Sequence, residues 1–230
     1  MKKLGLVGGM GVESTIPYYH DIVYGVQNKI GKKFFPNITI ESVNAFDVLG
    51  LCSEQKYDEL TDYLMQAIKN LTTSGTDFIA LSANTPHIVF DRLQNISTVP
   101  LVSIVEATRN EAIRLNKHKL GLLGTIFTMT EDFFKKPFYN SNIEIITPTA
   151  EEMEYINLKI SSELEFGVIK EETLQGFQKI VKRMQQEDNI EAVILGCTEL
   201  PLLFNDEVSP IPCLDTMKIH IQLLIDLIVE

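Results

Sequence analysis

The sequence predicts an α/β protein built as two similar, pseudo-symmetric halves, each a parallel sheet flanked by helices. Short apolar runs that end in glycine, such as Lys3–Gly8, are typical of buried parallel strands. Helical patterns lie between these runs. An internal repeat adds a third observation. KKLGLVGGM at Lys2 is echoed by HKLGLLGTI at His118, and TDFIALSANTPH at Thr76 by IEAVILGCTEL at Ile190, both at an offset of about 115 residues.

In the first half, apolar runs and alternation predict strands at Lys3–Gly8, Ile38–Val43 and Asp77–Leu81. We expect one helix to start at Glu13–Thr15 and to run toward Lys29. A second is predicted over Ser53–Leu71, because its apolar residues recur at helical spacing, at Leu60, Leu64, Ala67, Ile68 and Leu71. Pro86 suits the first turn of a third helix, which places His87 in that turn in a structural, supporting or substrate-contacting role.

The second half begins at Pro100–Ile104. Strands are expected at Leu120–Leu123, which turns at Gly124–Thr125, and at Ile143–Ile146, Ala192–Leu195 and Pro210–Leu214. Helices are expected from Thr128 or Thr130, over Glu151–Phe166 and Glu171–Gln186, and after Asp215 through Ile219, Leu223, Leu224 and Leu227.

Charge and cysteine content exclude several classes of protein. The 230 residues carry a formal charge of −11, which argues against binding to nucleic acid or to an anionic membrane. No apolar stretch is long enough for a membrane span, and the apolar run after Lys3 is too short for the core of a signal peptide. Three cysteines without metal-site spacing fit the reducing cytoplasm and predict no metal site, and they are Cys52, Cys197 and Cys213.

The segment AVILGCTEL at residues 192–200 is the strongest indication of chemistry. A buried-strand run ends in Gly196 and is followed by Cys197, Thr198 and Glu199. Open α/β sheets bind ligands at the carboxyl ends of their strands, and a partly exposed, donor-rich place suits a thiolate. The alternative is that Cys197 is a small buried hydrophobic residue. The repeat makes Ala83 its counterpart, so we expect both residues to face one active-site cleft between the halves.

At this point the chain resembles the aspartate/glutamate racemase family, in particular its aspartate racemase branch. The resemblance is carried by four blocks in the family's order, which are GLVGGMGVEST at Gly5, ANTPH at Ala83, GLLGTIFTM at Gly121 and GCTEL at Gly196. Glu199 follows the Cys-Thr pair, as in aspartate racemases. The resemblance implies that the closing helix packs on the first half. The expected domains are therefore 1–98 plus 209–230 and 99–208.

The resemblance implies a pyridoxal-independent amino-acid racemase, an isomerase that uses no cofactor or metal. One cysteine removes the α-proton of an aspartate- or glutamate-like substrate, and a second cysteine returns a proton on the opposite face. Cys197 matches one of them. The substrate-binding positions implied by the matching blocks are Met10, Asn84, Thr85, Thr128, Thr198 and Glu199. For Thr128, a plain helix N-cap is the alternative. The family also implies a homodimer, for which an apolar stripe near Tyr18, Tyr19 and Ile22 is a candidate surface.

Ala83 departs from the family, because alanine stands at the position of the other cysteine and cannot ionise. Three explanations are open. The alanine is engineered, it is natural in a branch that uses another acid or base on that face, or the protein has lost racemisation. Ser82 is a poor substitute, because strand alternation directs it to the other side.

Cationic partners for a substrate side-chain carboxylate are also missing. Glu165 stands where some relatives have lysine, and VNAFDVLG at Val43 contains no basic residue. A carboxylate normally requires a cationic partner, so aspartate as the substrate is in doubt. Lys159, Lys170 and Arg109 are alternative sources of charge, and Glu165 is expected on a solvated helix face.

Two other functions compete with a racemase. One is a single-cysteine enzyme of the wider superfamily, a decarboxylase or isomerase of small acids. The other is a non-catalytic protein that binds small carboxylates. Both gain if Ala83 is native, whereas a natural cysteine there favours the racemase.

Overall fold

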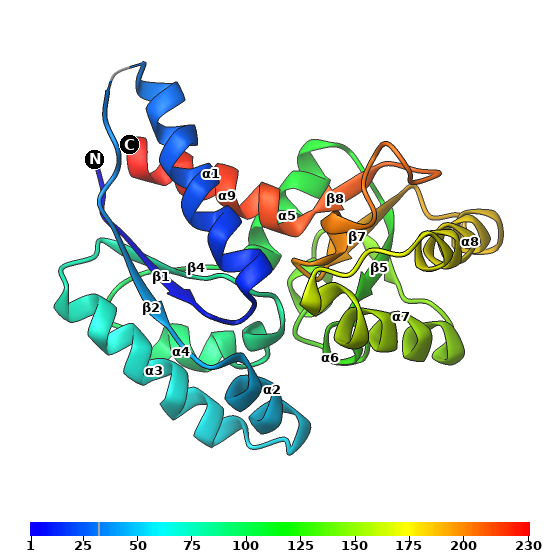
Figure 1. Cartoon of the computed structure of the whole chain (residues 1–230), viewed down its shortest axis with the longest axis horizontal. Helices are drawn as coiled ribbons and strands as arrows, with labels where there is room; N and C mark the ends of the chain where they lie inside the picture. The colour runs from blue at the N-terminus through cyan, green and yellow to red at the C-terminus, as the bar shows by residue number, and fades with distance from the viewer. Residues whose placement is uncertain (32) are drawn as a thin grey trace. The chain divides into compact units, whose positions relative to one another are not determined.

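The computed structural model describes residues 1–31 and 33–230, which form two compact units, residues 1–104 with 217–230 and residues 105–216. Each unit is a parallel sheet of four strands flanked by helices (Figure 1). The predicted fold class, with two similar halves, is therefore confirmed. The sequence-based division into domains, at 98/99 and 208/209, stays a prediction.

The sheet of the first unit has the strand order β2-β1-β3-β4, and all its pairings are parallel. Its strands are β1 (Leu4–Gly8), β2 (Ile38–Ser42), β3 (Phe78–Leu81) and β4 (Leu101–Val102). Helices α1 (Val12–Ile30) and α9 (Thr216–Val229) cover one face of the sheet, and α3 (Tyr57–Thr73) and α4 (Phe90–Ile96) lie on the other (Figure 1). Helix α2 (Ala45–Ser53) follows β2.

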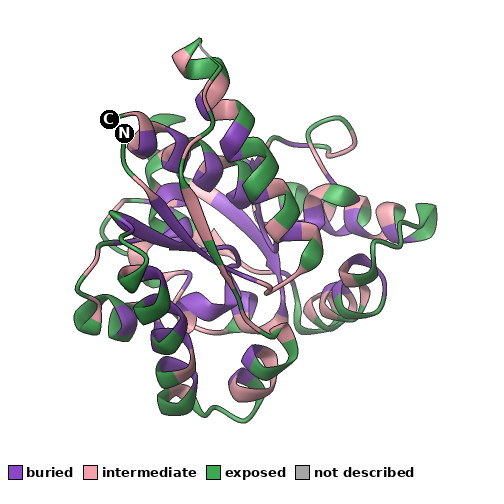
Figure 2. Ribbon diagram, turned by 60° about the vertical axis from the view of Figure 1, so that its left-hand side comes forward, coloured by how far each residue is buried: buried purple, intermediate pink, exposed green. Residues whose placement is uncertain are grey.

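The core of the first unit lies between its sheet and helices α1 and α9. Tyr18 and Ile22 of α1 are fully buried there against Leu4 and Leu6 of β1. Figure 2 shows the strands largely buried and the outer faces of the helices exposed. The expectation that Tyr18 and Ile22 form an association surface is therefore wrong, because these two side chains face their own sheet. The next residue, Tyr19, is turned away from this core and is 52% exposed.

The second unit repeats this arrangement with the strand order β6-β5-β7-β8, again all parallel. Its strands are β5 (Lys119–Gly124), β6 (Glu144–Ile146), β7 (Ala192–Gly196) and β8 (Cys213–Asp215). Its helices are α5 (Ile104–Arg114), α6 (Ile126–Thr130), α7 (Ala150–Ser162) and α8 (Glu171–Glu187). Strands β5 and β7 pack with α7 and α8 around one apolar core.

Several helices differ from the sequence prediction. The helix expected to start at Thr128 or Thr130 is α6, which starts at Ile126 and ends at Thr130. The helix expected around Pro86 begins as a 3₁₀ turn at Thr85–Val89, and α4 follows it.

The helix expected over Ser53–Leu71 is divided, because α2 ends at Ser53 and α3 starts at Tyr57. Gln55 between them has a φ of 54°, a left-handed conformation that interrupts a helix. The helix expected to reach Phe166 ends at Ser162 and is followed by a 3₁₀ turn at Leu164–Phe166. That turn brings Glu165 away from a regular helix face.

The strand order fixes where a ligand can bind in each unit. The chain leaves β1 toward β2 on one side of the sheet and later returns to β3 on the other side, and β5, β6 and β7 repeat this path. Such a reversal opens a crevice at the carboxyl ends of the two central strands. Ala83 follows β3 and Cys197 follows β7, so each lies at the ligand-binding edge of its own sheet.

The turn after β1 requires glycine at position 9. Gly9 has a φ of +81°, and a Cβ atom there would lie 2.2 Å from the carbonyl oxygen of Val43. Both the backbone conformation and the contact with the segment after β2 therefore exclude a side chain. Gly75 has a similar φ of +76°, but a Cβ there meets no atom within 4 Å.

We predict that Gly9→Ala lowers the free energy of unfolding by about 3 kcal/mol or more, since strain and overlap add. Gly75→Ala is the matched control, which carries only the strain of the left-handed conformation, about 1 kcal/mol. Urea unfolding of both variants measures the difference. Equal losses in the two variants would show that the turn after β1 relaxes without cost.

Candidate active site

Cys197 directly follows the last residue of β7, where two strand ends pack closely. Gly196 pairs with Gly124 of β5. A Cβ on Gly196 would lie 2.8 Å from the carbonyl oxygen of Leu123 and 3.0 Å from Cγ2 of Thr128. Glycine therefore allows the two strand ends and Thr128 to approach, and this packing sets the position from which Cys197 starts.

The Cys197 thiol donates a hydrogen bond to Glu199. Its Sγ lies 2.9 Å from Oε2 of Glu199, and Oγ1 of Thr198 donates to the same oxygen at 3.0 Å. All three side chains are buried, and Cys197 is 7% exposed. The expectation of a partly exposed Cys197 is therefore wrong, because the residue packs within the apolar core of its unit. A buried polar cluster of this kind has stronger electrostatic interactions than one in water.

The surroundings of Cys197 favour the thiol over the thiolate. Burial raises its pKa well above the ordinary value, and the negative charge of Glu199 and its hydrogen bond raise it further. The Glu165 carboxylate also raises the pKa of Cys197, whereas the backbone N–H of Glu199 acts in the opposite direction. Cys197 therefore holds its proton at neutral pH and directs it at a carboxylate.

Ala83 occupies in the first unit the position that Cys197 occupies in the second. Leu81 pairs with Val7 of β1 and Leu195 pairs with Leu123 of β5, and each site residue lies two positions further along. Asn84 and Thr85 follow Ala83 and are buried. The Oγ of Ser82 is buried and has no hydrogen-bond partner among residues 1–31 and 33–230.

His87 holds the segment that contains Ala83. Its Nδ1–H donates to the carbonyl oxygen of Ala83 at 3.0 Å, and its Nε2 accepts from the backbone N–H of Ile104 at 3.3 Å. The ring stacks on Phe90 at a centroid distance of 4.9 Å. Burial lowers the pKa of His87 to about 4, so the imidazole is neutral at physiological pH. These contacts give His87 a structural role.

The remaining residues implied by the family lie close to the turns after β1 and β5. Met10 is half-buried in the first turn, beside Gly9, whose N–H already donates to Oγ1 of Thr15 at 2.9 Å. Thr128 is fully buried, and its Oγ1 lies 3.2 Å from Oγ1 of Thr125. The N-cap of α6 is Thr125, not Thr128.

Lys159, Lys170 and Arg109, the basic residues that the sequence offered as partners for a substrate carboxylate, bind other groups of the protein. Glu163 binds Lys159 at 2.7 Å and Lys170 at 3.1 Å. Arg109 donates to the Asn110 side chain and to the Pro137 carbonyl.

Glu165 is the site residue whose position sequence reasoning missed. It is half-buried, and its charge acts on Cys197, so the expected solvated helix face is wrong. The sequence feature that could have predicted this position is Gly167. It ends the 3₁₀ turn with a φ of 67° and turns the chain after α7.

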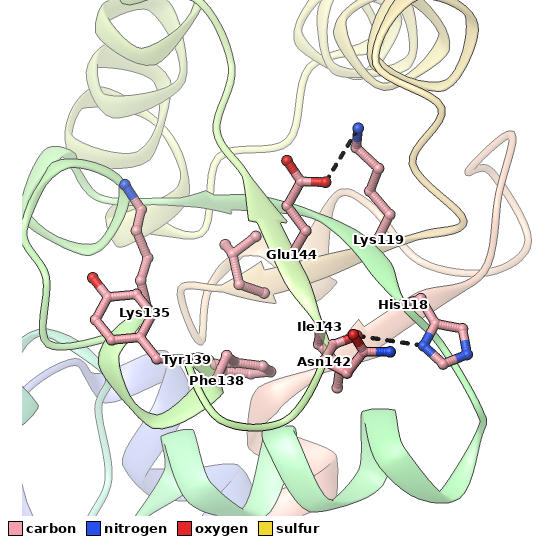
Figure 3. A pocket seen from close by; sticks show the side chains of 9 residues that line it. His118, Lys119, Lys135, Phe138, Tyr139, Asn142, Ile143 and Glu144 are labelled. Atoms are coloured by element: carbon pink, nitrogen blue, oxygen red, sulfur yellow. Dashed lines mark hydrogen bonds and ion pairs between the residues drawn. The ribbon is translucent and has the colours of Figure 1, made fainter.

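The hollow in Figure 3 lies at the other end of the second sheet. His118 and Lys119 stand at the start of β5, and Lys119 pairs with Glu144 at 3.3 Å. Cys197 follows the opposite, carboxyl ends of these strands, where ligands of open α/β sheets bind. The hollow therefore has no part in the chemistry of Cys197.

Among residues 1–31 and 33–230, no group of three or more His, Cys, Asp or Glu side chains has an arrangement that could hold a metal ion. None of the helices described there has the length and apolar character that crossing a membrane requires.

Comparison with known proteins gives the class of protein. The Asp/Glu/Hydantoin racemase family matches residues 7–224. The chain therefore belongs to this family, whose amino-acid racemases are isomerases that act without a cofactor.

Individual relatives are similar to this chain over all or nearly all of its length. The broad specificity amino-acid racemase RacX of Bacillus subtilis (strain 168) is 25% identical over 228 residues, 93% of this chain and 92% of the relative. An aspartate racemase homologue from Pyrococcus horikoshii OT3 is 35% identical with a TM-score of 0.85, and a candidate Asp/Glu racemase from Yersinia pestis is 32% identical with a TM-score of 0.92. Both structures match over 100% of each chain.

We predict that Glu199→Gln moves the titration of Cys197 to lower pH. The substitution removes the Glu199 charge, which raises the pKa of the thiol more than the Glu165 charge does. The ultraviolet absorbance of the thiolate reports this titration in a protein whose other cysteines are replaced, Cys52→Ala and Cys213→Ser. An unchanged titration would mean that the carboxylate does not act on the sulfur. Glu207→Gln, at an exposed glutamate, is the control.

We predict that acidification destabilises the protein through two buried histidines, His87 and His220. His220 lies on α9, and its Nδ1 is 2.7 Å from the Tyr18 hydroxyl oxygen. The folded-state pKa is lowered from 6.5 to about 4 for His87 and to about 3 for His220. The unfolded state therefore binds protons first, and stability present above pH 6.5 is lost as the pH falls toward 4. Each histidine removes up to about 1.4 kcal/mol per pH unit. Urea unfolding across this range should give a flatter dependence for His87→Gln, and the same slope in both proteins would contradict the assignment.

Proposed function

We propose that this protein is an amino-acid racemase that uses no cofactor and in which Cys197 is the acid and base on one face of the substrate. The observation that carries the proposal is the hydrogen bond from the Cys197 thiol to Glu199 at the carboxyl end of β7. Family membership supports the reaction class. Amino-acid substrates are supported by the similarity to RacX and to the aspartate racemase homologue.

The Cys197–Glu199 pair supplies a balanced proton path. The thiol passes its proton to the Glu199 carboxylate, and the resulting thiolate takes the proton from the substrate α-carbon. The C–H electron pair stays on the substrate as a carbanion. In the reverse direction, the thiol returns its proton to the carbanion and recovers a proton from Glu199. Proton transfer of this kind requires acid and base within hydrogen-bond distance, which the separation of 2.9 Å satisfies.

The carbanion needs donors directed at the substrate carboxylate, because no cofactor withdraws its charge. We assign this role to Asn84, Thr85 and Thr198, with Met10 and Thr128 as further substrate-binding positions. The proposal is supported by their places in or beside the segments that follow strands β1, β3, β5 and β7. Glu199 then acts on Cys197 rather than as a plain substrate contact.

Ala83 makes the proposed reaction one-sided. It offers no ionisable group at the position equivalent to Cys197, so the enantiomer that presents its proton there lacks a base. This asymmetry also favours the alternative of a single-cysteine enzyme that is not a racemase. The two functions differ in whether amino acids exchange their α-protons.

The proposed setting is the cytoplasm, and the proposed assembly is a homodimer. Free thiols at Cys52, Cys197 and Cys213 support a reducing compartment. An exposed apolar stripe on α1, formed by Val12, Ile16 and Tyr19, supports association.

We predict that the protein exchanges the α-proton of one enantiomer of its substrate with deuterium much faster than that of the other. NMR of each enantiomer in heavy water measures both rates. Ala83→Cys should raise racemisation by ~10²–10⁴-fold, the usual value of one positioned acid or base. Cys197→Ser should abolish exchange.

Equal exchange of both enantiomers would show that another residue is the second base. A complete lack of exchange with any amino acid would refute the racemase and support the alternative enzyme or a binding protein.

We predict that the protein sediments as a dimer at micromolar concentration and that Ile16→Glu makes it monomeric, since a charge would be buried in the apolar contact. Ile113→Glu on α5 is the control, because Ile113 is similarly exposed, at 51%, but outside the stripe. A native protein that sediments only as a monomer would refute the dimer.

A further inference from the structure

The Thr198 hydroxyl has one proton, and two groups of the proposed site require it. In the structure it donates to Oε2 of Glu199 at 3.0 Å, the same oxygen to which the Cys197 thiol donates at 2.9 Å. The proposed reaction also assigns Thr198 to the substrate carboxylate. A threonine hydroxyl is one donor with two acceptor lone pairs, so Thr198 serves either the Glu199 carboxylate or the substrate at any one time.

The Glu199 carboxylate depends on these two donors. Its side chain makes no ion pair and no third hydrogen bond among residues 1–31 and 33–230. Thr198 and Glu199 are 4% and 5% exposed, so little water replaces a donor that leaves. A hydrogen bond to a charged group shifts a proton equilibrium by roughly 10–100-fold. Loss of the Thr198 bond therefore makes the carboxylate attract the thiol proton more strongly.

The Cys197–Glu199 pair with one proton between them has two forms. The proton lies either on the sulfur, next to a charged carboxylate, or on Oε2, next to a thiolate. The Thr198 hydroxyl stabilises the first form, because it donates to the charged carboxylate. This agrees with the raised pKa of Cys197, whose main causes are burial and the Glu199 charge. The protein without substrate therefore keeps the unreactive thiol.

We propose that Thr198 couples substrate binding to the activation of Cys197, because its hydroxyl turns from Glu199 to the substrate α-carboxylate when an amino acid binds. This inference rests on the proposed function, since it concerns the proton of the proposed acid and base. Glu199 then keeps only the thiol as a donor, and the thiol proton passes to Oε2. The thiolate that remains takes the α-proton. The hydroxyl proton stays on Thr198 throughout, so Thr198 is a positioning residue for the Cys197 proton.

Alkylation of Cys197 by iodoacetamide measures the thiolate without catalysis, in the protein with Cys52→Ala and Cys213→Ser. Thiolate formed by loss of the proton to water increases about tenfold per pH unit. Thiolate formed by transfer to Glu199 is independent of pH, because the pair keeps its proton, and it gives a plateau on the acidic side. We expect Thr198→Val to raise this plateau by roughly 10–100-fold. Thr198→Ser, which keeps the hydroxyl, should leave it unchanged.

Further variants separate the hydrogen bond from a general loosening of the site. Thr198→Ala removes the same donor with a smaller side chain and should raise the plateau as valine does. Thr216→Val is the matched control, because Thr216 is also buried and its Oγ1 donates at 2.8 Å to the carbonyl of Leu195 on β7 rather than to a carboxylate. It should leave the plateau unchanged. Glu199→Gln should remove the plateau, alone and together with Thr198→Val.

Formate tests whether a carboxylate takes the Thr198 proton. It carries the carboxylate of an amino acid without an α-carbon, and is therefore the smallest probe of that position. Increasing formate should raise the alkylation plateau of the protein with Thr198 toward that of Thr198→Val, and it should leave the plateau of Thr198→Val unchanged. Sodium chloride at the same concentration is the control for ionic strength.

Three outcomes would overturn the inference while the racemase stands. Thr198→Val could leave the plateau as it is, which would mean that the hydroxyl does not restrain Glu199. Formate could leave the protein with Thr198 unchanged, so that the hydroxyl stays on Glu199. The gain from Thr198→Val could persist with Glu199→Gln or appear equally in Thr216→Val. If no amino acid exchanges its α-proton with heavy water, the proposed function itself is refuted.

Discussion

The hydrogen bond between Cys197 and Glu199 is the interaction on which the chemistry of this site depends. A single carboxylate oxygen accepts from both the thiol and the Thr198 hydroxyl, so the carboxylate fixes the sulfur and is itself held by the intervening residue. Burial strengthens both bonds, because little water competes for the donors. The sulfur and the carboxylate oxygen lie 2.9 Å apart, close enough for a proton to pass between them.

The segment that carries this pair starts where two strand ends approach closely, at Gly124 and Gly196. Thr128 fills the space next to Gly124, and Thr15 fills the space next to Gly8 in the first unit, where a Cβ would lie 2.7 Å from the threonine methyl. In each unit, therefore, a glycine at the end of the first strand allows a threonine of the following helix to pack against that strand. The repeat preserves the scaffold, whereas the residues after β3 and β7 have diverged. Alanine in one unit and cysteine in the other give two similar edges with unequal chemistry.

The sequence predicts the scaffold well because strands of a parallel sheet are buried on both faces and appear as apolar runs. The runs at Lys3–Gly8 and Ala192–Leu195 and the internal repeat were sufficient for the fold class. Local patterns failed where packing decides the outcome. The exposed side of α1 depends on which face meets the sheet, so Tyr18 was misplaced. The place of Glu165 depends on the turn after α7, which helical periodicity does not encode.

Net charge is a poor guide to what such a site selects, because exposed charges are screened by salt within about a Debye length. The charges that count are the few near Cys197. Glu199, Glu165 and the α-carboxylate of any amino acid are negative, and the α-ammonium balances one of them. Because burial weakens screening, these few charges act on the Cys197 thiol more strongly than the net charge of −11, and they favour the state in which the sulfur keeps its proton.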